Sequence, residues 1–182
     1  MDYNNIFGLD RIATIEGGGS ATIGLDYKLI DKETDSEFLK VGLAQVFRDE
    51  ENKDLPETSS VGHKSSDIFG NITFLNKDII NLDYIFNLDD GLTGTRYESI
   101  DLDLNVNKFV TSFEYLDDDI ASENINYLTS TIKYNLDNNH SLSFSRRDNQ
   151  RTDITEYNNL IYEYRNDCLR ASVEYKKQNY TN

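Results

Sequence analysis

The feature that most constrains this chain is a strict alternation of side-chain polarity between residues 98 and 115. From Ile100 to Val106 every second residue is apolar, and the residues between them are Asp or Asn. A short turn at 107–108 follows, and the alternation resumes from Phe109 to Tyr115. Because successive side chains of a β-strand point to opposite faces, this stretch predicts a hairpin with one apolar and one polar face.

The same alternation recurs along the chain and predicts an all-β fold, an antiparallel up-and-down meander of about ten strands. Short connections alternate with longer polar ones, which lie at 49–66, 89–96, 116–124 and 146–158. The predicted strands lie at 21–29, 39–47, 68–74, 80–88, 100–106, 109–115, 128–136, 142–144, 160–164 and 169–175.

This rhythm is typical of bacterial outer-membrane β-barrels, which have short periplasmic turns, longer outer loops, apolar side chains outside and polar ones inside. Strands of roughly nine to eleven residues, tilted by ~45°, cover roughly 21–26 Å, close to the ~25 Å apolar band of such barrels. The polar face is rich in Asp, Asn, Ser and Thr, which suits a hydrated interior better than a dry core. A soluble meander with one wet face is the alternative.

We therefore predict that residues 1–182 are a partial transmembrane β-barrel domain, part of a large outer-membrane barrel. Its first segment, 1–19, is predicted to be irregular, because Gly17, Gly18 and Gly19 indicate a turn or a close backbone approach. No basic start followed by an apolar run is visible, so we expect either a cytosolic chain or a piece of a longer precursor.

Composition excludes two broad classes of protein. A net charge of -15 argues against nucleic acid as a partner, because phosphates require Lys and Arg. The 12 Tyr and 9 Phe argue against a disordered chain, which would be poor in aromatic residues.

No residue pattern predicts an enzyme, a metal site or a cofactor. The acidic runs 117–119 and 89–90 fall in predicted outer loops, where solvated carboxylates are expected, with divalent-cation binding as the alternative. His63 and His140 lack the spacing of metal ligands. Ser141 lies beside His140, but neighbouring strand residues point to opposite faces and no nucleophile motif surrounds it.

The alternation also predicts which side chains face inward and which face lipid. Five tyrosines on the apolar face should lie near the membrane interfaces, as aromatic belts do: Tyr27, Tyr84, Tyr115, Tyr134 and Tyr175. The inward-facing set either contacts a transported substrate or a partner, or simply hydrates a large lumen. This set is Asp26, Lys28, Asp83, Asp101, Asp103, Lys133, Glu163, Arg165, Arg170, Glu174 and Lys176.

Several segments, in a shared order, resemble the C-terminal barrel of the LptD (OstA/Imp) family of LPS-assembly proteins. The first has an asparagine-aromatic stretch and an aspartate-arginine pair, followed by an acid-glycine step that leads into a strand. Another is a strand with glycine, glutamine, an aromatic residue and arginine in that order. An acid-cysteine turn between two late strands is also similar. The segments that carry the resemblance are Asn5–Arg11, Glu16–Gly18, Ala21–Tyr27, Gly42–Arg48, Asp54–Ser59, Lys64–Ile68 and Tyr162–Cys168.

This resemblance implies a barrel of about 26 strands in the Gram-negative outer membrane. Such a barrel encloses the lipoprotein LptE and inserts lipopolysaccharide into the outer leaflet. About ten strands cannot close it alone, so we expect a fragment that lacks the N-terminal jelly-roll domain and, with it, the contact to periplasmic LPS-bridge proteins. Lipopolysaccharide, an LptE-type lipoprotein and outer-membrane lipid are the implied partners, and the inward-facing set would line the lipopolysaccharide path or touch LptE.

Cys168 is the single cysteine, so no disulfide can form within this chain. The family often has an adjacent cysteine pair at such a turn, whereas Leu169 follows here. The barrel interpretation places Cys168 at a short turn in the oxidising periplasm. We therefore expect any disulfide to be intermolecular or to join a segment outside this chain.

Two other functions fit the same alternation. A porin-like passive outer-membrane channel needs the same strands and the same two faces. A soluble β-rich surface protein would need the apolar face to be covered by another layer.

Overall fold

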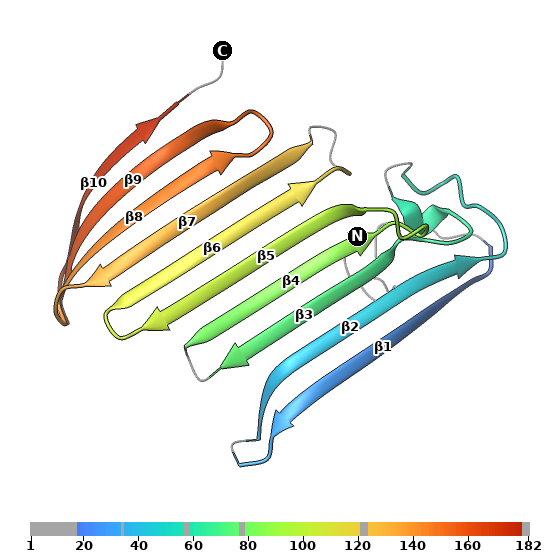
Figure 1. The fold of residues 1–182 in the computed structure, drawn as a ribbon, viewed down its shortest axis with the longest axis horizontal. Coiled ribbons are helices and arrows are strands. Elements are labelled where there is room, and N and C mark those ends of the chain that lie inside the picture. The colour runs from blue at the N-terminus through green and yellow to red at the C-terminus, as the bar shows by residue number, and fades with distance from the viewer. Residues whose placement is uncertain (1–17, 34, 57–58, 77–78, 121–123, 180–182) are drawn as a thin grey trace. The chain divides into compact units, whose positions relative to one another are not determined.

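The computed structural model describes residues 18–33, 35–56, 59–76, 79–120 and 124–179, and it confirms the all-β fold (Figure 1). No helix within these ranges is long and apolar enough to cross a membrane. The strands are β1 (Ser20–Asp31), β2 (Ser36–Arg48), β3 (Ile68–Asn76), β4 (Ile80–Leu88), β5 (Thr95–Val106), β6 (Phe109–Asp118), β7 (Ile125–Asn135), β8 (His140–Asn149), β9 (Ile154–Arg165) and β10 (Arg170–Gln178). A short 3-10 helix, η2 (Ser60–Gly62), lies between β2 and β3.

The strands form one ten-stranded sheet in which each strand pairs with the next along the chain (Figure 1). This order confirms the predicted antiparallel meander. Of the predicted irregular first segment, 1–17 lies outside the described residues. Gly18 has a φ of 81°, in the left-handed region that favours glycine, and the backbone N–H of Gly19 donates to Asp49 Oδ1 at 3.1 Å.

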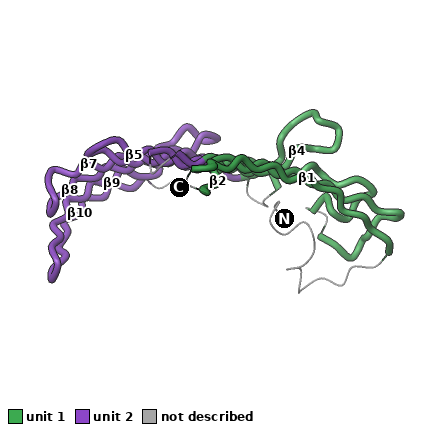
Figure 2. Tube along the Cα trace, turned by 90° about the horizontal axis from the view of Figure 1, so that it is seen from below, with its two compact units in different colours: residues 1–74, 83–99, 117–124 green, residues 75–82, 100–116, 125–182 purple. Residues whose placement is uncertain are grey.

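The chain divides into two compact units, coloured in Figure 2. Unit 1 comprises residues 1–74, 83–99 and 117–124, and unit 2 comprises residues 75–82, 100–116 and 125–182. Unit 1 therefore holds β1, β2 and the links that follow β2, β4 and β6. Unit 2 holds β7 to β10 and the short turns between them.

In unit 1 the register separates an apolar face from a polar face, as the alternation predicts. Leu25 of β1 lies opposite Leu43 of β2, and Tyr27 lies opposite Val41. Val41 in turn lies opposite Ile72 of β3, so the apolar side chains of three strands share one face. The residues between them in each strand form the polar face.

In unit 2 the same separation holds for β7 to β10. Ile132, Phe144, Leu160 and Tyr175 are aligned across the four strands and lie on the apolar face. All four side chains are exposed, from 42% for Leu160 to 68% for Tyr175. Exposed apolar side chains aligned across a sheet form a patch of the kind that marks a membrane or protein interaction surface.

Gly70 of β3 accommodates an aromatic ring on the apolar face of unit 1. The ring of Phe86 in β4 occupies the space that a Cβ at Gly70 would fill. Phe86 also stacks on Tyr84, with 5.1 Å between the ring centroids. An aromatic ring packed over a strand glycine restores the packing that the glycine lacks.

Two predicted connections are shorter than expected. β6 continues through Asp118, so part of the acidic run 117–119 is strand, and 146–158 is mostly strand because β8 ends at Asn149 and β9 begins at Ile154. Backbone pairing defines these ends, and polar side chains do not prevent it. The short–long rhythm therefore holds after β2, β4 and β6, whereas the link after β8 (150–153) is no longer than the turn 136–139.

Candidate functional site: the polar face

Each predicted inward-facing residue lies in a strand, but the structure distributes the set over β1, β4, β5, β7, β9 and β10. In unit 1, Lys28 Nζ pairs with Glu37 Oε1 at 2.8 Å, on the solvent-exposed part of β1 and β2. Asp83 Oδ1 accepts a hydrogen bond of 2.7 Å from Thr73 Oγ1. Asp26 lies opposite Gly42, on the same face of β1 as Lys28.

In unit 2 the predicted residues pair across neighbouring strands. Asp103 Oδ1 accepts a hydrogen bond of 2.6 Å from Ser112 Oγ. Glu163 Oε2 lies 2.6 Å from Arg170 Nη2, and Arg165 lies opposite Arg170, so three charged groups gather where β9 turns into β10. Other members of the set are Asp101 in β5, Lys133 opposite Ser143, Glu174 opposite Ile161 and Lys176 opposite Asn159.

A row of side chains crosses the polar face from β6 to β10, and of its members only Lys176 belongs to the predicted inward-facing set. We call Glu114, Tyr127, Arg147, Tyr157 and Lys176 the aromatic–cation row. Tyr127 Oη donates to Glu114 Oε1 at 3.0 Å. The guanidinium of Arg147 lies 4.2 Å from the ring centre of Tyr127 and 5.5 Å from that of Tyr157. Lys176 Nζ lies 5.0 Å from the ring centre of Tyr157.

Arg147 is the centre of this row. Its Nε donates to Thr129 Oγ1 at 2.9 Å, and its Nη2 lies 3.8 Å from Glu114 Oε2. Each cation–π contact is worth about 0.5–1 kcal/mol at an exposed site. Tyrosine combines an apolar ring with a polar tip, so the row presents flat apolar surfaces between positive charges.

Sequence reasoning missed Tyr127, Arg147 and Tyr157 because they lie outside the predicted strands. Tyr127 comes just before the predicted strand 128–136, while Arg147 and Tyr157 fall in the predicted connection 146–158. The usable signal was parity, since Arg147 follows Ser143 and Ser145 at intervals of two residues.

In unit 1 a folded link covers part of the polar face. Val46 of β2 and Phe69 of β3 are 1% and 2% exposed, and both point to the polar side. They pack with Ala44 and with Val61 of η2, while Leu55 lies against this small core. The link 49–67, predicted only as a polar loop, therefore has an apolar side of its own.

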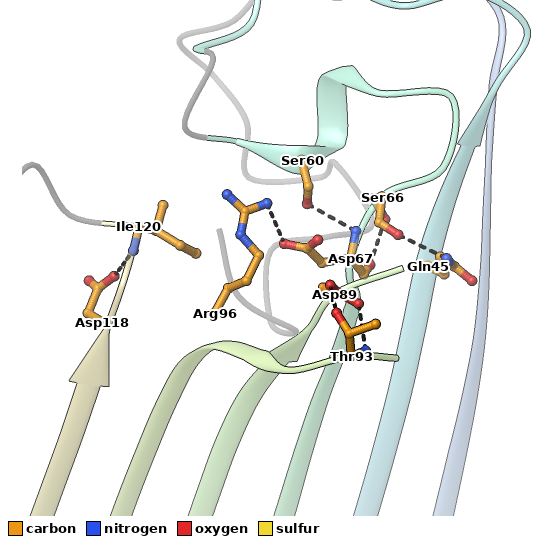
Figure 3. A network of polar contacts seen from close by, with 9 residues as sticks. All are labelled: Gln45, Ser60, Ser66, Asp67, Asp89, Thr93, Arg96, Asp118 and Ile120. Carbon is orange, nitrogen blue, oxygen red and sulfur yellow. Dashed lines mark hydrogen bonds and ion pairs between the residues drawn. The ribbon is translucent and has the colours of Figure 1, made fainter. Parts of the chain in front are cut away.

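Polar contacts hold the end of this link against β2 (Figure 3). Ser66 is 0% exposed, and its Oγ accepts from the backbone N–H of Val46 at 2.9 Å and donates to the carbonyl of Asp67 at 2.7 Å. Gln45, which interrupts the apolar face of β2, donates from Nε2 to the carbonyl of Ser66 at 2.9 Å. Asp67 Oδ2 lies 3.4 Å from Arg96 Nη1.

The acidic runs in the links hydrogen-bond their own backbone. The hydroxyl and the backbone N–H of Thr93 both donate to Asp89, and these hydrogen bonds lower the pKa of Asp89. Asp118 Oδ1 accepts from the backbone N–H of Ile120 at 2.8 Å (Figure 3). Within the described ranges, no group of three or more His, Cys, Asp or Glu residues has an arrangement that would hold a metal ion.

Cys168 is exposed in the turn between β9 and β10, with a free thiol. Its backbone N–H donates to Asn166 Oδ1 at 3.0 Å, as does the N–H of Leu169 at 2.7 Å. The asparagine side chain therefore shapes the turn, and the cysteine is accessible on it.

Comparison with known proteins gives one family. A comparison with curated proteins gave no match. The family model described as LptD, LPS transport system D, matches residues 1–166, which includes the first nine strands. The match covers nearly the whole chain, and the sheet is the predicted meander of strands with one apolar and one polar face, so the chain belongs to the LptD family.

Proposed function

We propose that this chain is part of an outer-membrane barrel that inserts lipopolysaccharide into the outer leaflet. The observation that carries the proposal is the LptD family match over residues 1–166. The sheet supports it, since its strands alternate between an apolar and a polar face as barrel strands do. In this proposal the apolar face contacts lipid and the polar face lines a hydrated lumen.

The ten strands are one contiguous part of a larger barrel, which about 26 strands close. A ten-stranded sheet is too narrow to enclose a lipoprotein, so an LptE-type partner is held by the complete barrel. A jelly-roll domain outside this chain contacts the periplasmic LPS-bridge proteins. Both partners are part of the proposal and are supported only by membership of the family.

The charge distribution supports a role for β8 to β10 in contacting an anionic glycolipid. The chain carries a net charge of -15, yet Arg147, Arg165, Arg170 and Lys176 lie in these three strands on the polar face. Arginine binds phosphate groups well because its planar guanidinium presents several donors. In this proposal the cations of β9 and β10 contact the saccharide and its phosphates, and the other members of the predicted inward-facing set hydrate the lumen.

The experiment is depletion of the full-length gene product in its own bacterium. We expect lipopolysaccharide at the cell surface to fall and to recover with the wild-type gene. Unchanged surface lipopolysaccharide, together with slower uptake of small hydrophilic solutes, would instead establish a porin-like channel. Copurification of an LptE-type lipoprotein with the full-length protein tests the partner separately.

A further inference from the structure

The apolar face of β7 to β10 is interrupted by a line of polar side chains. We call Ser130, Arg146, Asn158 and Lys177 the polar row, because the register aligns them across the four strands. Each lies two residues from a member of the apolar line Ile132, Phe144, Leu160 and Tyr175, and so points to the same face. The polar row therefore lies on the surface that the proposed function assigns to lipid.

Arg146 of this row has a defined ion-pair partner on the same face. Arg146 Nε lies 2.9 and 2.7 Å from the two carboxylate oxygens of Asp148, and Nη2 lies 2.8 Å from Oδ1. Thr155 of β9 donates to the same carboxylate at 2.6 Å. The Arg146 side chain is 51% exposed. A charged group on the lipid face costs about 2–4 kcal/mol at the bilayer centre and about 0–1 kcal/mol near the interface. This ion pair therefore belongs at headgroup level.

The other limit of the apolar surface is the turn between β7 and β8. Asp137 accepts from the backbone N–H groups of Asn139 and His140, both at 2.8 Å, and Lys108 Nζ donates to the carbonyl of Leu136 at 2.8 Å. His140 then contacts the hydroxyl of Tyr162 at 2.6 Å. Charged turn residues next to tyrosines are typical of a membrane interface.

The apolar surface between the polar row and the turn from β7 to β8 is short. Arg146 comes seven residues after Asn139, which is about 23 Å along the strand and about 16 Å across a membrane at ~45° tilt. Measured to Asp148, nine residues after Asn139, the span at the same tilt is still only about 21 Å. The apolar band of outer-membrane barrels is about 25 Å tall.

β1 has no such interruption. Between Gly19 and Asp31 its apolar-face positions run from Ala21 to Leu29 without a charged side chain. Asp31 comes twelve residues after Gly19, which is about 40 Å along the strand and about 28 Å at ~45° tilt. β1 is therefore long enough for a full apolar band.

We propose that the apolar face of β7 to β10 is covered by a locally thinned bilayer, with outer-leaflet phosphate headgroups at the level of the polar row. Lys177 supplies positive charge for those phosphates, and the Arg146–Asp148 ion pair places further polar groups at the same level. The inference rests on the proposed function, which places this face in the membrane, and it adds the local thickness of the bilayer at this face. A bilayer accommodates a short apolar segment by thinning around it.

The test is a depth measurement on the full-length protein in vesicles of phosphatidylcholine with phosphatidylglycerol. Single cysteines replace Ser130, Asn158, Phe144 or Leu25 in a background that carries Cys168→Ser, and each is spin-labelled. Relative collision rates with oxygen and with a water-soluble nickel chelate report depth. We expect labels at 130 and 158 to lie at headgroup level, at least several-fold more accessible to nickel than those at 144 and 25.

The outcomes separate this inference from the proposed function. Labels at 130 and 158 as deep as the label at 144 would overturn the thinning and leave the membrane placement intact. Labels at 25 and 144 that are fully accessible to nickel would overturn both.

A second variant tests the cause of the thinning. Replacing both partners, Arg146→Leu with Asp148→Leu, extends the apolar surface by two positions. We expect the label at 130 to become several-fold less accessible to nickel. Ser143→Leu adds one leucine to the polar face of the same strand and is the matched control, for which we expect no shift. A label at 130 that does not move in the double variant would overturn the assignment to this ion pair.

Discussion

The polar faces of the two units differ in whether a folded segment covers them. In unit 1 the link 49–67 folds onto β2 and β3 and buries Val46 and Phe69. In unit 2 no segment of the described residues covers the aromatic–cation row, and its charged side chains stay partly exposed. One alternating pattern therefore supports two kinds of surface, because the residues on the polar side decide whether that side is dry or wet.

The difference between the two polar faces comes from a few side chains. Ala44, Val46 and Phe69 are apolar residues on the polar side of unit 1, and they are stabilised by a cover that removes them from water. In unit 2 the corresponding positions include Thr131 opposite Ser145, whose hydroxyls hydrogen-bond at 2.9 Å. Such positions are satisfied without a cover, so that face is left accessible.

The largest expected effect is that of Phe69→Ala. Removing a fully buried ring from a small core costs about 3 kcal/mol, because a cavity replaces it. We expect the link 59–67 to detach and its amides to exchange faster in hydrogen–deuterium exchange of the folded protein. Tyr157→Ala in unit 2 is the control, and it should leave that link unchanged. Unchanged exchange in Phe69→Ala would mean that the core does not hold the link.

A similar but smaller loss is expected for Gly70→Val. The new side chain overlaps the ring of Phe86, and overpacking costs about 1–3 kcal/mol. Gly94→Ala is the matched control, because a Cβ there meets no atom within 4 Å. Thermal unfolding in detergent should separate the two variants, and equal melting temperatures would contradict the packing of Phe86 on Gly70.

Ser66→Ala tests the polar contacts that hold the link 49–67 against β2. The change leaves the buried backbone N–H of Val46 without its acceptor, at a cost of about 1–3 kcal/mol. We expect faster amide exchange at 45–47 and 64–67 and no change in β7 to β10. Protection that persists at Val46 would contradict the assigned hydrogen bond.

In unit 2, Arg147→Leu should cost about 0.5–2 kcal/mol, since it removes two cation–π contacts and the hydrogen bond to Thr129. Arg147→Lys keeps the charge but loses the planar stacking, so we expect an intermediate loss. The measurement is amide exchange of β7 to β9. An effect in the link 49–67 as large as that in β7 to β9 would break the distinction between the units.

The smallest expected effect concerns pH at a turn of unit 2. Backbone N–H groups, first that of Asn139, donate to Asp137 and lower its pKa below the ordinary 3.8. The stabilisation is therefore complete above pH 3.8 and is lost as pH falls through the lowered pKa. Exchange at Asn139 and His140, corrected for intrinsic rates, should show this loss, and Asp137→Asn should remove the pH dependence while keeping the turn. A pH dependence that persists in Asp137→Asn would assign it elsewhere.

The sequence alone determined the strands and their two faces. Alternation with a period of two is a local property, visible in Ile100 to Val106 without any other part of the chain, and all ten predicted strands are present. The family could also be predicted from the sequence, because the match depends on the order of local segments from residue 1 to residue 166.

Only the tertiary structure decided where β8 ends, that Phe69 lies under a folded link, and that Tyr127, Arg147 and Tyr157 form one row. These facts depend on register and on contacts between residues that are far apart in the sequence. Tyr127 and Arg147 are 20 positions apart, and Asp67 and Arg96 are 29 positions apart. Polar side chains such as Arg146 and Asp148 fit a strand or a loop equally well until backbone hydrogen bonds choose between them. The polarity pattern specifies which face a side chain takes, whereas its partners are set by how neighbouring strands align.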